Sequence, residues 1–377
     1  MKDLENLRNR IDAIDQDIVE LYNERMRIVS DVAELKRGEG GSIYRPEREE
    51  SIMRKVTDLA GEANAHKIGM LYKTIMRQSR ERQYEIISAD MPVERIIGCG
   101  TSSGADVGTV AYAGLPGSYT HIAAGYMYPA ADMRGLLHFD SVMEAVADGA
   151  CDAGILPIYN TTEGIVADVY EGLMKRELYI SDSIALPISH CLLGVRGAAL
   201  NDIVCVISHP QALGQCADYL RGHGFTPLTD VNTSVAAQKI AREGNRSNAA
   251  IASAMSAELY GLDVLADNIS DSDCNKTRFI AVTKTPVITP QANRISLCFT
   301  LPHESGSLSN ILSVAADYRL NLVNLQSLPL PQKPWEYRFY MDITGNVDDP
   351  AVRAILYMLF NELEEIRFLG NYNDTDS

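Results

Sequence analysis

The chain has 377 residues, 46% hydrophobic and 22% charged, which is the balance of a globular protein with two or three domains. Its net charge of −16 argues against binding to nucleic acids or to an anionic membrane surface, and no apolar run approaches the ~18 residues that span a bilayer. The charged N-terminus is unlike a secretory signal, and the seven scattered cysteines lack a C-x-x-C pair or metal-ligand spacing, so we expect a cytoplasmic protein with free thiols and no metal.

Residues 1–88 are predicted to form a helical domain. They are rich in Leu, Ile, Glu and Arg and contain one proline, Pro46. Two positions of each seven-residue repeat in the first helix are aliphatic, with one exception, Arg25. A charge in an apolar seam is costly unless something pairs with it. Two interpretations of Arg25 remain open: a structural ion pair with a buried carboxylate, and an anion site within a helical bundle.

Lys36 is the natural companion of Arg25 in such an anion site. The two residues lie within ~20° of each other around the helix axis and ~16 Å apart along it, so both side chains could reach one small ligand. Arg8 lies ~25 Å from Arg25 along the same helix, too far to share that ligand. If Arg8 contributes to a site, that site belongs to a partner subunit, which predicts an intertwined dimer.

Several short motifs of this block together resemble the all-helical chorismate mutases. They are L-R-x-x-I-D-x-I-D at 7–15, E-R at 24–25, K at 36, R-P-E-R-E at 45–49 and S-R-E-R-Q at 79–83. The resemblance implies a pocket lined by Arg8, Arg25, Lys36, Arg48, Glu49, Ser79 and Gln83.

The expected mutase chemistry suits these residue types. The rearrangement of chorismate to prephenate needs no nucleophile, so the enzyme clamps two carboxylates and stabilises negative charge on the breaking ether oxygen. The resemblance implies that Lys36 and Gln83 face this oxygen and that Glu49 holds a substrate hydroxyl. Relatives often have Asp where this chain has Arg45.

Residues 89–107 are predicted to be a linker, because the stretch from Gly98 to Gly108 is dense in Gly and Ser. From 108 to 284, strand-like runs alternate with helical runs. The pairs are 109–114 with 121–128, 153–158 with a helix after Thr162, 202–208 with 211–220, and 249–253 with 254–261. This alternation predicts βαβ units and mostly parallel sheets.

Four motifs of this middle block, in this order, resemble prephenate dehydratase. They are A-Y-A-G-L-P-G-S-Y-T-H at 111–121, L-P-I-Y-N-T-T-E-G at 156–164, S-H-P-Q-A-L-G-Q-C at 208–216 and N-K-T-R-F at 275–279. The resemblance implies two α/β lobes, like those of periplasmic binding proteins, with the active site in the cleft between them. Such a cleft, with strand ends and helix N-termini at its walls, suits a dianion.

The resemblance makes Thr277 the catalytic residue, whose hydroxyl would donate a hydrogen bond to the leaving oxygen. It implies that the substrate is held by Asn160, Thr161, Ser208 and Gln215. Arg278 is either a carboxylate partner of the substrate or a structural salt bridge. For His121 and His209 we expect capping or packing roles rather than acid catalysis. Relatives typically have Glu where this chain has Tyr159, and a phenol is not anionic at neutral pH.

Residues 285–293 carry two prolines and are predicted to be a second linker. The last block, 294–373, has the βαββαβ order of a ferredoxin-like α+β domain, with strands at 294–301, 321–327, 335–344 and 366–371 and helices at 308–318 and 350–363. The motifs at 302–310 and 334–339 resemble the phenylalanine-binding ACT domain of this family. The resemblance implies an effector site formed by Glu304, Gly306, Ser307, Leu308, Gln326 and Ser327.

One departure bears on feedback by phenylalanine. Where relatives carry E-S-R-P, this chain has Q-S-L-P at 326–329, which removes one carboxylate and one guanidinium. A hydrogen bond to a charged group is worth ~1.5–3 kcal/mol. We therefore expect phenylalanine to inhibit weakly or not at all.

Together the three blocks predict a homodimer or larger oligomer that converts chorismate to prephenate and then to phenylpyruvate without a cofactor. Two alternatives remain. The first is a binding protein that senses an aromatic acid without chemistry; Tyr159 and the altered C-terminal motif favour it, whereas Thr277, Arg25 and Lys36 argue against it. The second is an enzyme in which one of the two sites is inactive.

Overall fold

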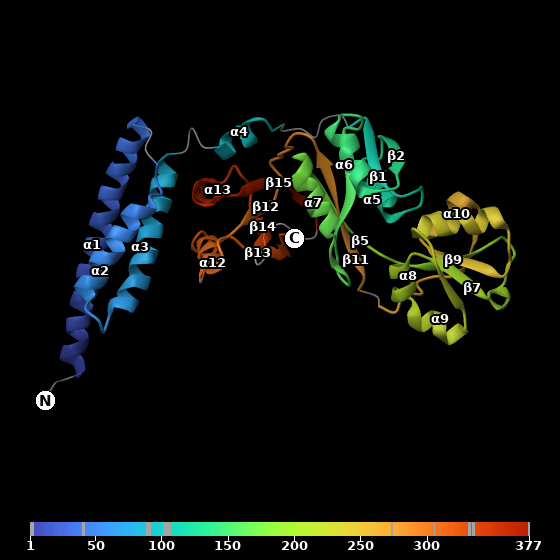
Figure 1. The fold of residues 1–377 in the computed structure, drawn as a ribbon, viewed down its shortest axis with the longest axis horizontal. Helices are drawn as coiled ribbons and strands as arrows, with labels where there is room; N and C mark the ends of the chain where they lie inside the picture. Colours follow the sequence, from blue (N-terminus) through green and yellow to red (C-terminus); the bar gives the residue numbers. More distant parts are fainter. Residues whose placement is uncertain are drawn as a thin grey trace.

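The structure is a computed structural model that describes residues 4–39, 42–87, 92–100, 107–272, 274–304, 306–330, 333 and 336–375. Part of the predicted linker 89–107, and the residues Pro334 and Trp335 of the last motif, lie outside these ranges. Figure 1 shows a helical part, a central part of two lobes, and a mixed part between the helices and the first lobe. Within the described ranges, no helix is long and apolar enough to cross a membrane.

The N-terminal part consists of three helices that lie side by side, as predicted: α1 (Leu4–Glu39), α2 (Pro46–Ala60) and α3 (Ala65–Ile86) (Figure 1). Helix α2 begins with proline at its first position and carries Glu47 and Glu49 in its first turn, where the helix dipole favours carboxylates. The aliphatic seam of α1 is not covered by α2 or α3. All nine aliphatic side chains of the seam are 37% to 66% exposed.

The first central lobe is built on three parallel strands, β1 (Thr109–Ala113), β2 (Asp132–Leu136) and β3 (Ala153–Asn160), with the short β4 (Gly164–Ile165) against β3. Its helices are α5 (Tyr119–Met127), α6 (Phe139–Ala147) and α7 (Ala167–Arg176). The apolar faces of α6 and α7 pack on the sheet around Met143, Leu156 and Leu173, which are fully buried.

The second lobe has a five-stranded sheet in the order β10-β6-β9-β7-β8. The strands are β6 (Cys191–Gly194), β7 (Cys205–Ser208), β8 (Thr226–Thr229), β9 (Asn248–Ala252) and β10 (Asp263–Ala266). The helices are the 3-10 turn η1 (Leu200–Asp202), α8 (Pro210–Gln215), α9 (Ala217–His223), α10 (Thr233–Glu243) and α11 (Ala254–Tyr260).

Two long strands connect the lobes: β5 (Tyr179–Pro187) leads into the second lobe and β11 (Lys276–Thr283) returns from it (Figure 1). They pair with each other in antiparallel fashion, and β11 is also antiparallel to β3. The predicted βαβ units are confirmed for β1 to β3 and for β7 to β9. The expectation of mostly parallel sheets is wrong for each sheet taken as a whole. In the first sheet, β5 leaves the first lobe and β11 returns to it, so these two strands run in opposite directions.

The C-terminal part has the predicted βαββαβ order: β12 (Arg294–Thr300), α12 (Ser307–Asp317), β13 (Leu322–Pro329), β14 (Tyr337–Thr344), α13 (Pro350–Glu362) and β15 (Ile366–Asp374). Its strands form an antiparallel sheet in the order β13-β14-β12-β15. The ferredoxin-like prediction is therefore confirmed. The short helix α4 (Pro92–Gly98) packs on α13.

Strand β15 also pairs with β5 of the first lobe, so the two sheets form one ten-stranded sheet. Gly370 allows this approach, because a Cβ added there would lie 2.1 Å from the carbonyl oxygen of Ile180. A buried ion cluster lies beside the junction. Asp374 forms an ion pair with Arg294, which is 1% exposed, and lies 3.6 Å from the guanidinium of Arg278.

Candidate active sites

The first site lies between α1 and α3. Arg25 donates from Nη1 to the hydroxyl of Ser79, and Lys36 donates from Nζ to Oε1 of Gln83 over 3.0 Å. Ser79 and Gln83 are buried and lie one turn apart on α3, whereas Arg25 and Lys36 are ~16 Å apart along α1. The side chains of Arg25 and Lys36 therefore converge on neighbouring positions of α3.

Local contacts orient the polar groups of this site. The Gln83 amide donates from Nε2 to the carbonyl oxygen of Ser79 over 3.1 Å, so its oxygen faces Lys36. The Ser79 hydroxyl donates to the carbonyl oxygen of Ile75 over 2.6 Å, so it accepts from Arg25. Burial lowers the pKa of Lys36, and the neighbouring Arg45 lowers it further.

The other residues expected in this pocket lie at different distances from it. Glu49, on the first turn of α2, accepts from Arg80 of α3 through its Oε1 atom. Arg48 and Arg8 are exposed, and Arg8 lies ~25 Å along α1 from Arg25. The sequence analysis did not place Arg80 in the pocket, although Arg80 belongs to the motif at 79–83. Its position next to Ser79, which was expected in the pocket, could have indicated it.

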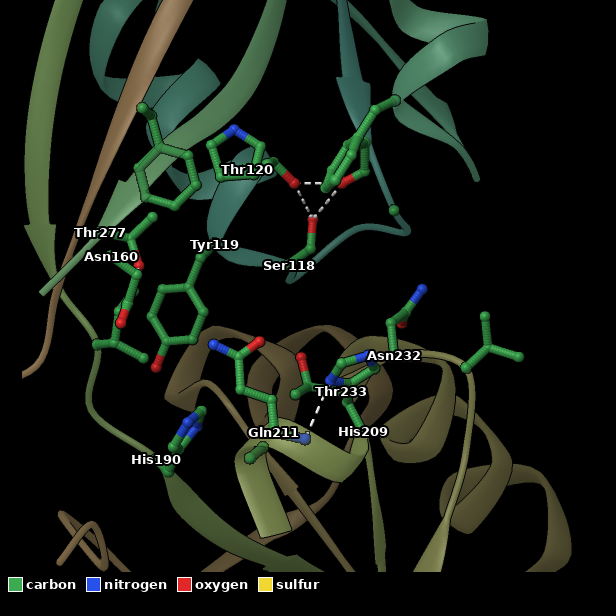
Figure 2. A pocket seen from close by; sticks show the side chains of 18 of the residues that line it. Ser118, Tyr119, Thr120, Asn160, His190, His209, Gln211, Asn232, Thr233 and Thr277 are labelled. Carbon is green, nitrogen blue, oxygen red and sulfur yellow. Dashed lines mark hydrogen bonds between the residues drawn. The ribbon is translucent and has the colours of Figure 1, made fainter. Parts of the chain in front are cut away.

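The second site is a cavity of about 380 Å³ between the two central lobes. Figure 2 shows Ser118 and Thr120 on the first-lobe side, His209, Gln211, Asn232 and Thr233 on the second-lobe side, and Asn160 and Thr277 at one wall. The cleft predicted between two lobes is therefore present.

A hydrogen-bond network fixes the wall that carries Thr277. The Asn160 oxygen Oδ1 accepts from the Thr162 hydroxyl over 2.6 Å and from two backbone N–H groups, so its Nδ2 must be the donor on the other side. Nδ2 donates to Thr277 Oγ1 and to Asn275 Oδ1, each over 2.8 Å. The Thr277 oxygen thus already accepts one bond, which leaves its proton free to be donated.

Gln215 joins this network from the second lobe. Its Oε1 accepts from Asn275 over 3.0 Å and lies 3.0 Å from Nε2 of His190, and its Nε2 donates to the Thr162 hydroxyl. His190 is 3% exposed, and burial lowers its pKa while Gln215 acts in the opposite direction. The sequence analysis assigned no role to His190, Asn275 or Thr162, although Thr162 and Asn275 lie within the motifs at 156–164 and 275–279.

Three residues expected to bind the substrate lie outside the cavity lining. Ser208 is fully buried and donates to the carbonyl oxygen of Ile251, and the Thr161 hydroxyl donates to that of Cys274. Thr162, rather than Thr161, contacts Asn160 and Gln215. Arg278 points to the opposite face of β11 from Thr277 and pairs with Asp374. Of the two interpretations of Arg278, this contact matches the structural salt bridge.

Tyr159 also lies away from the cavity. It stands opposite Arg278 in the pairing of β3 with β11 and packs against the core of the first lobe, whereas its neighbour Asn160 faces the cavity. Neighbouring residues of a strand point to opposite faces. The phenol therefore does not occupy the substrate space in this conformation.

The cavity lining, among the described residues, contains no Lys or Arg. Two helix N-termini open onto it instead: Ser118 caps α5 and Asn232 caps α10. Backbone N–H groups at such ends carry partial positive charge and bind anions. The ring of His209 caps α8, which is one of the roles expected for it, and the ring of His121 accepts from the Gly117 N–H. Burial lowers the pKa of both rings.

The residues expected to bind an effector are divided between two places. Glu304 and Ser307 line a cavity between α3 and the C-terminal part, Gly306 is the N-cap of α12, and Leu308 packs against the apolar core beside it. Gln326 and Ser327 lie on β13, at the edge of the ten-stranded sheet. Within the described part of one chain they do not line the same cavity.

These features define a multidomain protein with two separate candidate active sites, one in a helical bundle and one in an α/β cleft. The sequence profile of chorismate mutase type II matches residues 7–84, and that of prephenate dehydratase matches residues 110–287. The bifunctional chorismate mutase/prephenate dehydratase of Aquifex aeolicus (strain VF5) is 30% identical over 382 residues, which are 99% of this chain and 98% of the relative.

Solved structures resemble the central and C-terminal parts. The prephenate dehydratase from Arthrobacter aurescens, solved in complex with L-Phe, is 28% identical with a TM-score of 0.65, over 71% of this chain and 90% of that chain. GqqA, described as a quorum-quenching acylase, is 29% identical with a TM-score of 0.65, over 71% of this chain and 98% of that chain.

The chain belongs to the bifunctional chorismate mutase/prephenate dehydratase family. It is an isomerase and a lyase on one polypeptide, and it carries out two successive steps of phenylalanine biosynthesis, from chorismate to prephenate and from prephenate to phenylpyruvate. The resemblances of the first two blocks, to chorismate mutase and to prephenate dehydratase, are confirmed.

Proposed function

We propose that residues 1–88 form the mutase domain, 108–284 the dehydratase domain and 294–373 an ACT regulatory domain. The linkers are 89–107, which contains the short helix α4, and 285–293. The mutase site is formed by Arg25, Lys36, Ser79 and Gln83, with Glu49 at its edge. Arg25 binds a carboxylate of chorismate in place of its present partner Ser79. Lys36 and Gln83 then face the ether oxygen, where the ammonium stabilises the negative charge that develops as the bond breaks.

The convergence of Arg25 and Lys36 on neighbouring positions of α3 is the observation that carries this assignment. A single chain supplies fewer cations than a dicarboxylate needs, because Arg8 and Arg48 lie apart from the pair. We assign Arg8 to the site of a partner subunit. The exposed seam of α1 supports this homodimer: nine uncovered aliphatic side chains along one helix are expected to pack against a second copy.

At the dehydratase site, Thr277 donates its free proton to the departing hydroxyl while carbon dioxide leaves and the ring becomes aromatic. Asn160 orients Thr277, and Gln215 and Thr162 hold the network that orients Asn160. The substrate carboxylates lie toward the N-termini of α5 and α10, which replace cationic side chains. No resident cofactor enters this chemistry.

We assign L-phenylalanine as an effector of the C-terminal domain with weak affinity. The A. aurescens structure with L-Phe supports the ligand class. An effector site that is incomplete in one chain is supported by the separation of its expected residues: Glu304 and Ser307 lie apart from Gln326 and Ser327. The free edge of β13 offers a surface where a second copy would complete it. A cytoplasmic location fits the absence, in the described residues, of a membrane-spanning helix.

The test is to incubate the purified protein with chorismate and to follow prephenate and phenylpyruvate separately. We expect both products to appear in sequence, at protein concentrations where the chain is a dimer by analytical ultracentrifugation. Accumulation of prephenate alone would contradict an active dehydratase site, and conversion of added prephenate but not of chorismate would contradict an active mutase site. Titration of phenylalanine into both assays tests the weak effector.

A further inference from the structure

Arg80 connects the helical part of the chain to its C-terminal part. Its Nη1 atom donates to Glu49 of α2, while Nε and Nη2 donate to the two carboxylate oxygens of Glu362 on α13, over 2.6 and 3.2 Å. The guanidinium also lies over the ring of Tyr44, 5.2 Å from its centroid. One side chain thus joins two carboxylates that lie more than 300 positions apart in the sequence.

Helix α3 separates two environments. Ser79 and Gln83 face the mutase site and contact Arg25 and Lys36. Arg77, Arg80 and Tyr84 face the C-terminal part, where Arg77 lies 2.7 Å from Asp317 of α12. Helix α3, which carries half of the mutase site, therefore also contacts α12 and α13.

The geometry of the Arg80 bridge is restrictive. Its side chain is 13% exposed, and those of Glu49 and Glu362 are 25% and 18% exposed. A guanidinium binds a carboxylate at two points when its plane and that of the carboxylate coincide, so Glu362 determines the plane of Arg80. Arg80 in turn holds one oxygen of Glu49 and leaves Oε2 of Glu49 for another donor.

A bridge of this kind is weak evidence for stability. Desolvation of buried charges offsets most of their attraction, and apolar side chains of similar volume often stabilise as well. The arrangement fits a role in orientation better, because a planar fork fixes both partners in direction as well as in distance.

We propose that Glu362 is a positioning residue of the mutase reaction, which acts through Arg80 on Glu49 and makes mutase turnover depend on the docked C-terminal domain. The inference rests on the proposed role of Glu49 as the group that holds a chorismate hydroxyl. Without the two-point contact of Glu362, Arg80 keeps only its contacts with Glu49 and Tyr44. Its plane is then no longer fixed, and Glu49 loses the direction in which its second oxygen is presented. Small displacements of this kind reduce turnover, since a shift of about 1 Å can cost ~100-fold.

The test compares Glu362→Gln with Asp317→Asn in the full-length protein. Both variants remove a carboxylate that contacts an arginine of α3, but Asp317 pairs with Arg77 and has no link to Glu49. We expect Glu362→Gln to lower mutase kcat/KM by about 10- to 100-fold and Asp317→Asn to leave it within twofold. Conversion of added prephenate, measured on the same samples, should be unchanged in both.

A double-mutant cycle separates positioning from general loosening. Glu49→Gln alone should reduce mutase kcat/KM, and Glu362→Gln should reduce it little further in that background, because the two act in series. Arg80→Lys, which keeps the charge but cannot hold two carboxylates, should resemble Glu362→Gln.

The outcomes are distinguishable. If Glu49→Gln keeps full mutase activity, the proposed role of Glu49 itself is wrong. If Glu49→Gln is impaired while Glu362→Gln is not, Glu49 keeps its role and the positioning by Glu362 is overturned. Equal losses in Glu362→Gln and Asp317→Asn, or fully additive losses in the cycle, would also overturn it, because they indicate looser docking rather than a specific relay.

Discussion

The amide nitrogen of Asn160 donates to the hydroxyl oxygen of Thr277 over 2.8 Å, and this contact decides which role the threonine can play. A hydroxyl has one proton to donate, and here its oxygen is already an acceptor. Asn160 cannot turn the other way, since its own oxygen is held by Thr162 and two backbone N–H groups. Thr277 is thereby prepared as a donor toward the cavity.

The first prediction follows from this donor. Thr277→Ala should reduce dehydratase kcat by about 10²–10³, because one hydrogen bond to the leaving oxygen is lost in the transition state. Thr277→Ser should retain most activity, since it keeps the hydroxyl. The measurement is the formation of phenylpyruvate from added prephenate, with mutase activity as the internal control. Near-normal turnover in Thr277→Ala would exclude this residue as the key donor.

A second prediction distinguishes two adjacent threonines. Thr162→Ala removes the donor that fixes Asn160 and an acceptor of Gln215, so it should lower dehydratase kcat/KM by about tenfold or more. Thr161→Ala is the matched control, because its hydroxyl bonds to backbone groups of Cys274 and Lys276. It should cost stability rather than turnover. A larger catalytic loss in Thr161→Ala than in Thr162→Ala would contradict the placement of Thr162 in the site.

The third prediction concerns the shared mutase site. Arg8→Ala and Arg25→Ala should each abolish most mutase activity and leave conversion of prephenate intact. When the two variants are mixed and allowed to exchange subunits, part of the mutase activity should return, because one of the two sites in a mixed dimer is whole. Mixed dimers that form but remain inactive would show that Arg8 does not reach the partner's site.

The fourth prediction uses the pKa of Lys36. Burial and Arg45 both lower this pKa, and the ammonium must be protonated to stabilise the ether oxygen. Arg45→Asp removes a repulsive neighbour and adds an attractive one, so the pKa should rise. The pH at which mutase kcat/KM declines on the alkaline side should move upward. Arg54→Asp, at a highly exposed position of α2, is the control for a general change of charge. An equal shift of the profile in both variants would contradict a local effect of Arg45.

The fifth prediction concerns Glu81, which is buried between α3 and α12. Its pKa is raised to about 7, chiefly by burial; Arg77 and Arg80 act against this shift and Asp317 acts with it. Between pH 4.5 and 7 the folded protein holds a proton that the unfolded chain has lost, so stability falls as the pH rises across this window. Each pKa unit corresponds to about 1.4 kcal/mol. Thermal unfolding of the wild type should show this slope, and Glu81→Gln should reduce it; an unchanged slope would mean that Glu81 is not the titrating group.

Local sequence patterns predicted helices and strands well where the spacing of apolar residues or the order of the elements was regular. The seven-residue repeat of α1 and the βαββαβ order of residues 294–373 both appear in the structure. What these patterns could not supply was the face to which a side chain points. Ser208, Thr161 and Arg278 lie next to cavity residues in sequence, yet their hydroxyls or guanidinium turn to backbone groups or to Asp374.

The contacts that were missed are long-range. His190 lies outside the quoted motifs, whereas Asn275 and Arg80 lie inside them. The importance of all three arises from partners 25 to 282 positions away. No period or motif within a short window encodes such a pairing. The antiparallel strands β5 and β11 were missed for a related reason, since their direction depends on how the chain enters and leaves the second lobe.

The junction of β15 with β5 has a consequence for synthesis of the protein on the ribosome. Strand β5 is complete some 180 residues before β15 emerges, so the nascent first lobe presents an unpaired strand edge for many seconds at ~5–20 residues per second. An open edge of this kind can pair with another nascent chain. The side chains of Arg278 and Ser183 also lack their contact with Asp374 until the last strand has been synthesised. A fragment that ends before β12 would retain that open edge permanently and should aggregate, whereas the full-length chain covers it with its own last strand.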